Sequence, residues 1–363
     1  MLIMKQKQPI SICIITKNEC NVLKECLERL FPHVQNAEHE IVVVDTGSTD
    51  DTVGMCRTYT NSIYEFPWIH DFSAARNFAA QKAKNDWILC IDSDEYITSW
   101  DEDNLQQQIN HNPQGIGGFS LLCTCGFGPN QYQSLSKVYR LYNRKYYQFE
   151  RPIHEQINPF DSALGHPCFM TALTADHYSY SGSPEELSAK SKRNIELLEK
   201  ELTQNPHDPY VLFQLGQSYY MVEDFEKALY YYDLGLSKDV DPRMDYVHTM
   251  VVSYGYTLIN LKQYQRALDL EGIYDTFGHR ADFVFLMGMI YLNNGLFEDA
   301  ILQFQKATTY DTAEVVGANS FRAWHNIGVI YECAGFPEEA IKHYQKCGDF
   351  APAKERLNIL QNT

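Results

Sequence analysis

Three acidic residues follow a short apolar run in the stretch ILCIDSDEYI. Asp92 and Asp94 are two positions apart, and side chains two apart on a strand point the same way. Such a pair binds one hard divalent cation, or a cation together with a ribose hydroxyl. Two carboxylates this close repel each other unless a cation fills the site. A solvated acidic turn is the alternative, and Glu95 is a third ligand, a helix cap or a solvated side chain.

Two other polar features come earlier in the chain. Asp45 ends the apolar run IVVV, where its carboxylate accepts hydrogen bonds from a base or ribose, or caps a turn. Arg76 lies in DFSAARN, one turn inside a helix that we expect Ser73 to cap. From there a guanidinium can bind a diphosphate with two parallel hydrogen bonds. A surface salt bridge is the other interpretation of Arg76.

The elements around these residues alternate between short apolar runs and helical stretches. We predict strands at 10–15, 41–44 and 87–92, and helices at 19–30, after a cap at Ser48 or Thr49, and after Ser73. This order predicts an α/β fold with a mostly parallel, doubly wound sheet. Ligands of such sheets bind outside the carboxyl ends of the strands, where Thr16, Asp45 and Asp92 fall. Residues 101–180 are predicted to complete the sheet. We expect Arg140 and Arg144 to lie on a solvated strand edge, and steering of the donor or acceptor is the alternative role for both.

The second half of the chain is predicted to be helical and repetitive. Ser183 with Pro184 reads as a helix start, which places the domain boundary at 1–182 and 183–363. Beyond it, each of four glycines is followed twelve residues later by an alanine, with Gly-to-Gly spacings of 39, 33 and 40. Small residues at a fixed period indicate paired helices that approach closely, as in tetratricopeptide repeats. The pairs are Gly216 with Ala228, Gly255 with Ala267, Gly288 with Ala300 and Gly328 with Ala340.

Composition narrows the possible functions. The formal net charge is −17, so nucleic acid and anionic membrane surfaces are not expected partners. No apolar run is long enough for a membrane helix, and we identify no signal peptide. The ten cysteines include no CxxC pair, which fits a reducing compartment and a cytoplasmic location.

The motifs ITKNE, VVVDTGSTDDT, DFSAARN and LCIDSDE resemble, in order and spacing, the family 2 glycosyltransferases of the GT-A fold. The resemblance implies a nucleotide-sugar donor, here expected to be a UDP-sugar, a divalent metal such as Mn or Mg, and inversion at the anomeric carbon. Carried over to this chain, Thr16 and Glu19 border the nucleoside and Asp45 contacts the base. Arg76 approaches the diphosphate, Asp92 holds ribose or metal, and Asp94 is the main metal ligand.

A subgroup with a helical repeat tail, which includes the peptide S-glycosyltransferases of bacteriocin pathways, is similar in layout beyond residue 150. The chain has Ile153-His154-Glu155 and then His177 in His-Tyr-Ser-Tyr, but Arg151-Pro152 departs from the subgroup's pattern. Inverting transfer needs a base on the acceptor side. Glu155 is our first candidate, followed by His154 and Asp71. We expect His177 to complete the metal shell or to touch the diphosphate, and Mn tolerates an imidazole better than Mg does.

The sequence therefore predicts an enzyme that transfers a sugar to a Cys, Ser or Thr side chain of a peptide or protein bound by the repeats. A saccharide or lipid-linked envelope glycan is the alternative acceptor. An interaction scaffold with a degenerate transferase domain is the alternative of another class. The repeats are also a possible route to homo-oligomers.

Overall fold

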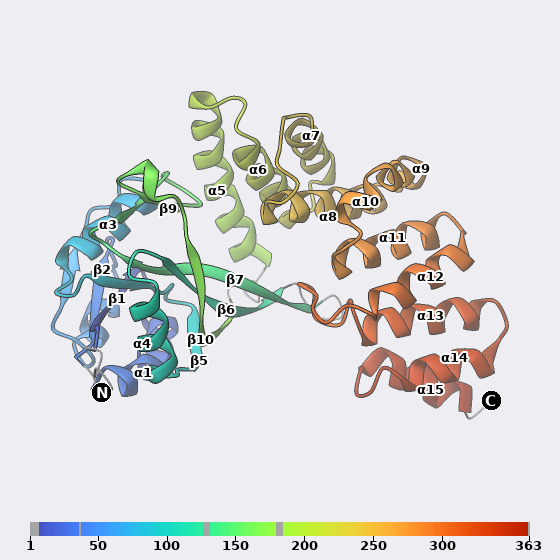
Figure 1. Cartoon of the computed structure of the whole chain (residues 1–363), viewed down its shortest axis with the longest axis horizontal. Helices are drawn as coiled ribbons and strands as arrows, with labels where there is room; N and C mark the ends of the chain where they lie inside the picture. Colours follow the sequence, from blue (N-terminus) through green and yellow to red (C-terminus); the bar gives the residue numbers. More distant parts are fainter. Residues whose placement is uncertain (1–6, 36–37, 126–130, 179–183, 362–363) are drawn as a thin grey trace. The chain divides into compact units, whose positions relative to one another are not determined.

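The protein was analysed as a computed structural model, which describes residues 7–35, 38–125, 131–178 and 184–361 (Figure 1). The chain divides into two compact units, Met1–Gly182 and Ser183–Thr363. The first is an α/β unit and the second is helical. Ser183, the predicted helix cap, lies outside the described residues.

An eight-stranded mixed sheet forms the first unit, in the order β3-β2-β1-β4-β7-β6-β10-β5. Strands β3, β2, β1 and β4 are parallel, as predicted, whereas β7 runs antiparallel to both β4 and β6. A two-stranded sheet of β8 and β9 accompanies it. The strands are β1 (Ile10–Thr16), β2 (Glu40–Asp45), β3 (Ile63–Glu65), β4 (Trp87–Cys90), β5 (Glu95–Ser99), β6 (Ile116–Cys125), β7 (Tyr132–Asn143), β8 (Tyr147–Glu150), β9 (Gln156–Pro159) and β10 (Cys168–His177).

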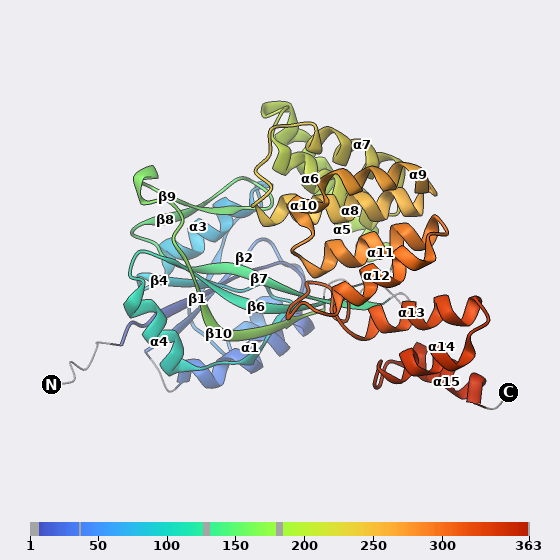
Figure 2. The ribbon, with the colours of Figure 1, turned by 45° about the vertical axis from the view of Figure 1, so that its right-hand side comes forward.

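Both faces of this sheet are covered (Figure 2). On one face, Leu23 and Leu27 of α1 and Leu105 of α4 pack with the sheet in one apolar cluster. On the other, Ala79 of α3 and Phe149 of β8 pack in a second cluster. Two-sided burial explains why the parallel strands are continuous apolar runs. The helices are α1 (Cys20–Gln35), α2 (Thr52–Cys56), α3 (Phe72–Lys82) and α4 (Glu102–His111).

The two predicted helix caps are wrong. The carboxylate of Asp71, not Ser73, accepts the N–H of Ala74 and begins α3, and the Ser73 hydroxyl instead donates to the carbonyl of Arg151. Helix α2 begins only at Thr52, with no side-chain cap, so neither Ser48 nor Thr49 serves it. Asp and Ser are both good cap residues. Because Asp71 and Ser73 lie only two positions apart, the sequence does not show which of them precedes the first helical residue.

Arg144 is not a solvated edge residue as predicted. Its Nη1 donates to the carbonyls of Ala80 and Ala83, at 2.7 Å in each case, and so caps the carboxyl end of α3. The carbonyls in the last turn of a helix have no partner within the helix, and a cation also complements the helix dipole there. Arg144 therefore ties α3 to the end of β7.

Replacing Arg144 with alanine is expected to lower the free energy of unfolding by about 1–2 kcal/mol, because two charge-assisted hydrogen bonds are lost from a partly buried site. The matched control is Lys145→Ala, since Lys145 is 63% exposed and pairs with Asp86 at the surface. That variant should stay within about 0.5 kcal/mol of the wild type in urea unfolding. Equal losses in the two variants would contradict the capping role.

The second unit consists of antiparallel helix pairs, as the glycine and alanine spacing predicted (Figure 1). A Cβ added to Gly216 of α6 would lie 2.4 Å from Tyr232 of α7, and one at Gly328 of α13 would lie 2.6 Å from Tyr344 of α14. The partner alanine of each pair is fully buried. The helices are α5 (Pro184–Gln204), α6 (Pro209–Met221), α7 (Phe225–Leu236), α8 (Asp245–Asn260), α9 (Tyr264–Ala267), α10 (Tyr274–Phe277), α11 (Ala281–Asn293), α12 (Phe297–Ala307), α13 (Phe321–Cys333), α14 (Pro337–Gln345) and α15 (Ala351–Gln361).

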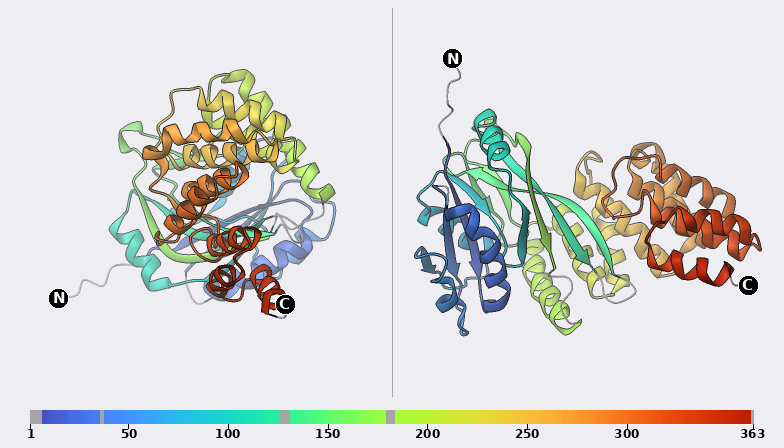
Figure 3. Two further views of the ribbon diagram at one scale, coloured as in Figure 1. Left: turned by 90° about the vertical axis from the view of Figure 1, so that its right-hand side faces the viewer. Right: turned by 90° about the horizontal axis from the view of Figure 1, so that it is seen from below.

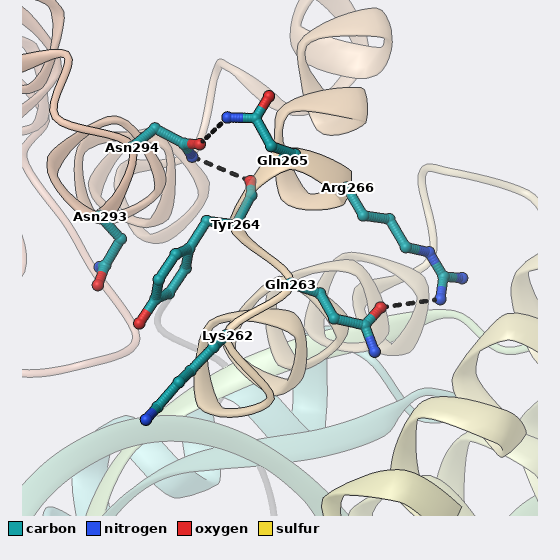
Figure 4. A pocket seen from close by; sticks show the side chains of 7 residues that line it. All are labelled: Lys262, Gln263, Tyr264, Gln265, Arg266, Asn293 and Asn294. Atoms are coloured by element: carbon teal, nitrogen blue, oxygen red, sulfur yellow. Dashed lines mark hydrogen bonds between the residues drawn. The ribbon is translucent and has the colours of Figure 1, made fainter.

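The second pair departs from the pattern. After α8 the chain forms the short helix α9, a 3-10 segment at Leu268–Ile273 and the short helix α10, in place of one continuous helix. This is the repeat whose Gly-to-Gly spacing is 33 rather than 39 or 40. At the turn into α9 lies a polar pocket of about 420 Å³ (Figure 4), which contains none of the residues predicted to do chemistry. Its lining includes Gln265, whose side-chain amide donates to Asn294 at 2.8 Å.

His248 of α8 is a buried histidine without hydrogen bonds. It is 1% exposed, and neither ring nitrogen has a hydrogen-bond partner among the described residues. Glu314 lies 3.8 Å from its Nδ1. Burial, reinforced by the charge of Arg280, lowers the pKa of His248 to about 4. The ring is therefore neutral in the folded protein at neutral pH.

The contribution of His248 to the stability of the helical unit is expected to fall as the pH drops from about 6.5 to 4, whereas burial raises the pKa of the neighbouring Glu314 to about 7, which contributes in the opposite direction. In this pH range His248 is protonated in the unfolded state but not in the folded state. Its contribution to the free energy of unfolding therefore drops, by up to about 3 kcal/mol. Urea unfolding followed by far-ultraviolet circular dichroism at several pH values measures this. Relative to the wild type, His248→Phe should remove this loss of stability on acidification, whereas the same change at the exposed His207 should leave the pH dependence unchanged. Equal slopes in both variants would contradict the prediction.

Within the described residues, no helix combines the length and the apolar character needed to cross a membrane.

Candidate active site

The carboxyl ends of β1 and β2 meet at one edge of the sheet, as predicted. Thr16 and Asp45 are direct neighbours in the ladder, and the Thr46 N–H donates to the Thr16 carbonyl at 2.9 Å. The carboxylate of Asp45 accepts the N–H groups of Gly47 and Ser48, at 3.1 and 3.0 Å. Asp45 therefore stabilises a turn in this structure, which is one of its two predicted roles.

Glu19 joins two loops at this edge. Its carboxylate accepts the hydroxyl of Thr16 at 3.2 Å and also the hydroxyl of Ser93, which lies between the two predicted metal ligands. The loop after β1 is thus hydrogen-bonded to the turn after β4. The residues predicted to border the nucleoside and those predicted to hold the metal form one connected site.

Asp92 and Asp94 do not lie on a strand. Strand β4 ends at Cys90, and both acids lie in the turn before β5. The predicted alternation of side chains therefore does not apply to them. The chain bends here because the Glu95 carboxylate accepts the N–H of Asp92 at 2.9 Å, which closes a tight turn.

Two arginines bind the carboxylate of Asp92. Arg76 Nη2 donates to one oxygen at 2.6 Å, and Arg140 Nη1 donates to the other at 2.9 Å. Burial alone would raise the pKa of Asp92, but the charges of Arg140 and Arg76 outweigh it and hold that pKa well below its usual range. Asp92 is therefore ionised and held between two cations.

Arg140 extends this arrangement to Glu95. The same Nη1 donates to the Glu95 carboxylate at 2.8 Å, and Glu95 is fully buried. Burial raises the pKa of Glu95, although Arg140 opposes the shift. The prediction that Arg140 occupies a solvated edge is thus wrong. Glu95, whose role the sequence left open, is an internal partner of this arginine.

Of the three candidate bases, Glu155 contacts Arg76, and His154 precedes Glu155 in the chain. Arg76 Nε donates to the Glu155 carboxylate, and the Arg76 side chain is 7% exposed. Burial lowers the pKa of His154 to about 4, and its Nε2 is buried with no hydrogen-bond partner among the described residues. Asp71, the third candidate, caps α3 by accepting the N–H of Ala74, three residues later, at 2.9 Å. Five charged side chains therefore alternate in sign: Glu155, Arg76, Asp92, Arg140 and Glu95.

Asp94 pairs with His177 at the end of β10. His177 Nε2 lies 3.2 Å from Asp94 Oδ1, and the two side chains are 12% and 20% exposed. On the other side of the ring, Nδ1 lies 3.8 Å from the thiol sulfur of Cys123. Burial alone would lower the pKa of His177, but hydrogen bonds to Asp94 and Cys123 and nearby negative charge raise it to about 10.

The donor set suits a divalent metal of the kind predicted. A carboxylate and an imidazole side by side match the ligands that Mn accepts, and both remain partly exposed. No group of three His, Cys, Asp or Glu side chains among the described residues is arranged to hold a metal. Asp94 and His177 would supply ligands to a metal here, and oxygens of the donor and water could supply others.

The sequence contained one signal for Arg140. Leu141 and Tyr142 follow it directly on β7, where the ladder shifts register, so that Val138 and Tyr142 pack in the apolar clusters on opposite faces of the sheet. Tyr142 is fully buried, and an arginine in line with buried residues needs acidic partners. The cluster of acids after β4 supplies those partners. The pairing of β7 with β4 is non-local, however, and no local pattern predicts it.

Comparison with known proteins assigns both parts of the chain. Residues 11–166 match glycosyl transferase family 2, and residues 281–314 and 321–354 match the tetratricopeptide repeat. The chain thus joins a family 2 glycosyltransferase domain to tetratricopeptide repeats, as the motifs and the glycine spacing predicted.

Two curated relatives are similar over more than half of the chain. A TPR repeat-containing protein of Synechococcus elongatus is 30% identical over 63% of this chain and 57% of its own length. The SPbeta prophage-derived glycosyltransferase SunS of Bacillus subtilis is 28% identical over 62% of this chain and 53% of its own length. The match thus spans little more than half of each relative. Among solved structures, MamA covers 50% of this chain and 98% of its own, at 20% identity and a TM-score of 0.38.

Proposed function

We propose that the chain is a metal-dependent, inverting glycosyltransferase that moves a sugar from a UDP-sugar to a Cys, Ser or Thr side chain of a peptide or protein. The observation that carries the proposal is the pairing of Asp94 with His177 beside the arginine-bound Asp92. These residues lie next to the strand ends that hold Thr16 and Asp45, in the domain that matches glycosyl transferase family 2.

In this proposal Thr16, Glu19 and Asp45 would bind the nucleoside, and Arg76 would bind the diphosphate, whose charge a metal would also neutralise. Arg76 Nη1 is buried and has no hydrogen-bond partner among the described residues. An orphaned buried donor is costly, and a phosphate oxygen reached by a small movement of the side chain would satisfy it. Asp92 holds the guanidinium of Arg76 in place from the other side.

Asp94 and His177 would hold the metal, which when bound supplies a positive charge opposite the departing nucleoside diphosphate. His177 must lose its extra proton to become a ligand, so metal binding should release protons. Glu155 is the proposed base that takes the proton of the acceptor, followed by His154 and Asp71. The acceptor atom attacks the anomeric carbon from the face opposite the leaving group, which inverts it.

The experiment is a donor screen without acceptor. The purified chain is incubated with Mn and a panel of nucleotide sugars, and release of the nucleoside diphosphate is measured. We expect hydrolysis of at least one UDP-sugar, which stops on addition of a chelator. If no donor is hydrolysed and no nucleoside diphosphate binds, the repeats alone would define the protein and the proposal would fail.

A further inference from the structure

Strand β7 has an open edge next to the candidate active site. On one side, β6 pairs with it along its length, from Leu141 to Tyr132. On the other side, β4 pairs only with the last residues, from Leu141 to Asn143. No other described strand pairs with residues 133–138, and no backbone hydrogen bond joins them to another segment that the structure describes. The hairpin of β6 and β7 is long in the views of Figures 1 and 3.

This edge can accept one further strand. In an antiparallel ladder every second residue directs its N–H and C=O groups away from its partner. Residues 133–138 therefore offer a row of backbone donors and acceptors on the open side. Such a row is a template for an extended chain, which is how many domains bind peptides.

The position of the edge connects it to the site. Strand β4 pairs with the end of β7 on this same open side. It ends at Cys90, and the turn that contains Asp92 follows it. A strand added beside residues 133–138 would lie on the same side of β7 as β4, beyond the point where β4 ends. Its near end would meet Arg140, the β7 residue that binds Asp92 at 2.9 Å. An acceptor side chain at that end would lie next to the residue of β7 that binds Asp92.

Side chains on β7 indicate the chemistry of the occupant. Leu135 is 48% exposed and Lys137 is exposed beside it on the same face. Strands β6 and β7 carry two cations, Lys137 and Arg140, and no acid, in a chain of net charge −17. Cross-strand neighbours of these residues would be an apolar side chain opposite Leu135 and an acidic one opposite Lys137.

We propose that the acceptor peptide binds as an added β-strand on the edge of β7 at residues 133–138, in place of the repeats, which the sequence predicted as its binding surface. We infer that this peptide is neutral or acidic and carries an apolar residue near its acidic one. This inference rests on the proposed function and names its acceptor. The peptide backbone supplies the affinity, the side chains facing Leu135 and Lys137 supply the selectivity, and Arg140 marks the end at which transfer occurs.

The first test uses proline substitutions at two adjacent positions. Ser136 and Lys137 direct their N–H groups to opposite sides of β7. Proline at the one that faces β6 disturbs the hairpin, whereas proline at the other removes an edge donor and leaves the hairpin paired. Transfer is measured with the full chain, Mn and the donor found by hydrolysis. The probe is a pool of twelve-residue peptides with a central Cys or Ser, acidic and apolar flanks and otherwise mixed sequence.

We expect one of Ser136→Pro and Lys137→Pro to keep donor hydrolysis within about twofold of the wild type and to lose transfer at least about tenfold. Retained hydrolysis with undiminished transfer in that variant would overturn the inference, as would a wild type that modifies no peptide in the pool. Hydrolysis without edge-dependent transfer removes only the acceptor site, whereas absence of donor hydrolysis removes the proposed function itself.

A charge reversal gives a second test that does not depend on the proline variants. Lys137→Glu leaves the backbone intact and changes only an exposed side chain. The ratio of transfer to an acidic pool over a matched basic pool should exceed one in the wild type and fall about two- to fivefold in the variant. An unchanged ratio would overturn the assignment of Lys137 to the docking surface.

Discussion

Asp94→Ala is expected to lower metal-dependent donor hydrolysis by about 100-fold or more, the largest effect on activity that we predict. Of the two ligands proposed for the metal, Asp94 is the charged one, and the variant removes it. Loss of Asp94 also leaves His177 without its partner at 3.2 Å. Hydrolysis measured at saturating donor, with Mn varied, separates weaker metal binding from slower chemistry.

The fold should survive this change, because the Asp94 side chain is 20% exposed. Asp103→Ala is the matched control, since Asp103 is an exposed acid in the first turn of α4. It should keep the wild-type rate within about twofold. Full turnover in Asp94→Ala at saturating donor would show that the metal is held elsewhere.

Arg76→Met is expected to lower the free energy of unfolding by about 3–5 kcal/mol, the largest effect on stability. Arg76 is 7% exposed at the side chain, and it contacts both Asp92 and Glu155. Its loss leaves these carboxylates facing a low-dielectric interior with less compensating charge. Urea unfolding, together with donor hydrolysis, measures both consequences, and hydrolysis should be lost as well.

Two further variants test the cause of this loss. Arg57→Met changes an exposed arginine of the same unit and should have little effect. Adding Glu155→Gln to Arg76→Met should restore part of the stability, because one of the uncompensated charges is removed. If Arg76→Met unfolds at the same urea concentration as the wild type, the buried network does not stabilise the unit.

Much of the frame of this site could be predicted from the sequence. Thr16 and Asp45 each end an apolar run, and parallel strands bring their carboxyl ends together at one edge of a sheet. The sequence therefore predicts that the two residues are neighbours, as they are in the structure. The glycine and alanine spacing predicted helix pairs in which Gly216 faces Tyr232. Both signals are local and periodic, so a single chain is enough to read them.

The failures share a different cause. Arg140 was placed on a solvated edge because its partners, Asp92 and Glu95, lie on elements that come much earlier in the chain. The sequence also predicts that Asp92 and Asp94 lie on a strand, because no residue type in the apolar run signals that β4 ends at Cys90. Both features depend on contacts between residues far apart in the sequence. The hydrophobic pattern of a single segment does not report such contacts.

The buried network changes the interpretation of the acidic cluster. One of its acids, Asp92, is neutralised by two arginines, and another, Glu95, is fully buried against one of them. Only Asp94 lies beside an imidazole in a partly exposed position. The acids of this cluster therefore have two roles. Asp92 and Glu95 hold the arginines in place, and Asp94 is proposed to hold the metal.

Titration calorimetry with UDP, in the presence and absence of Mn, tests the central claim most directly, because it requires neither the sugar nor the acceptor to be known. The account predicts heat of binding for the wild type with Mn, and binding at least about tenfold weaker without Mn or in Asp94→Ala. Absence of binding for UDP and for every other common nucleoside diphosphate, with Mn present, would contradict it.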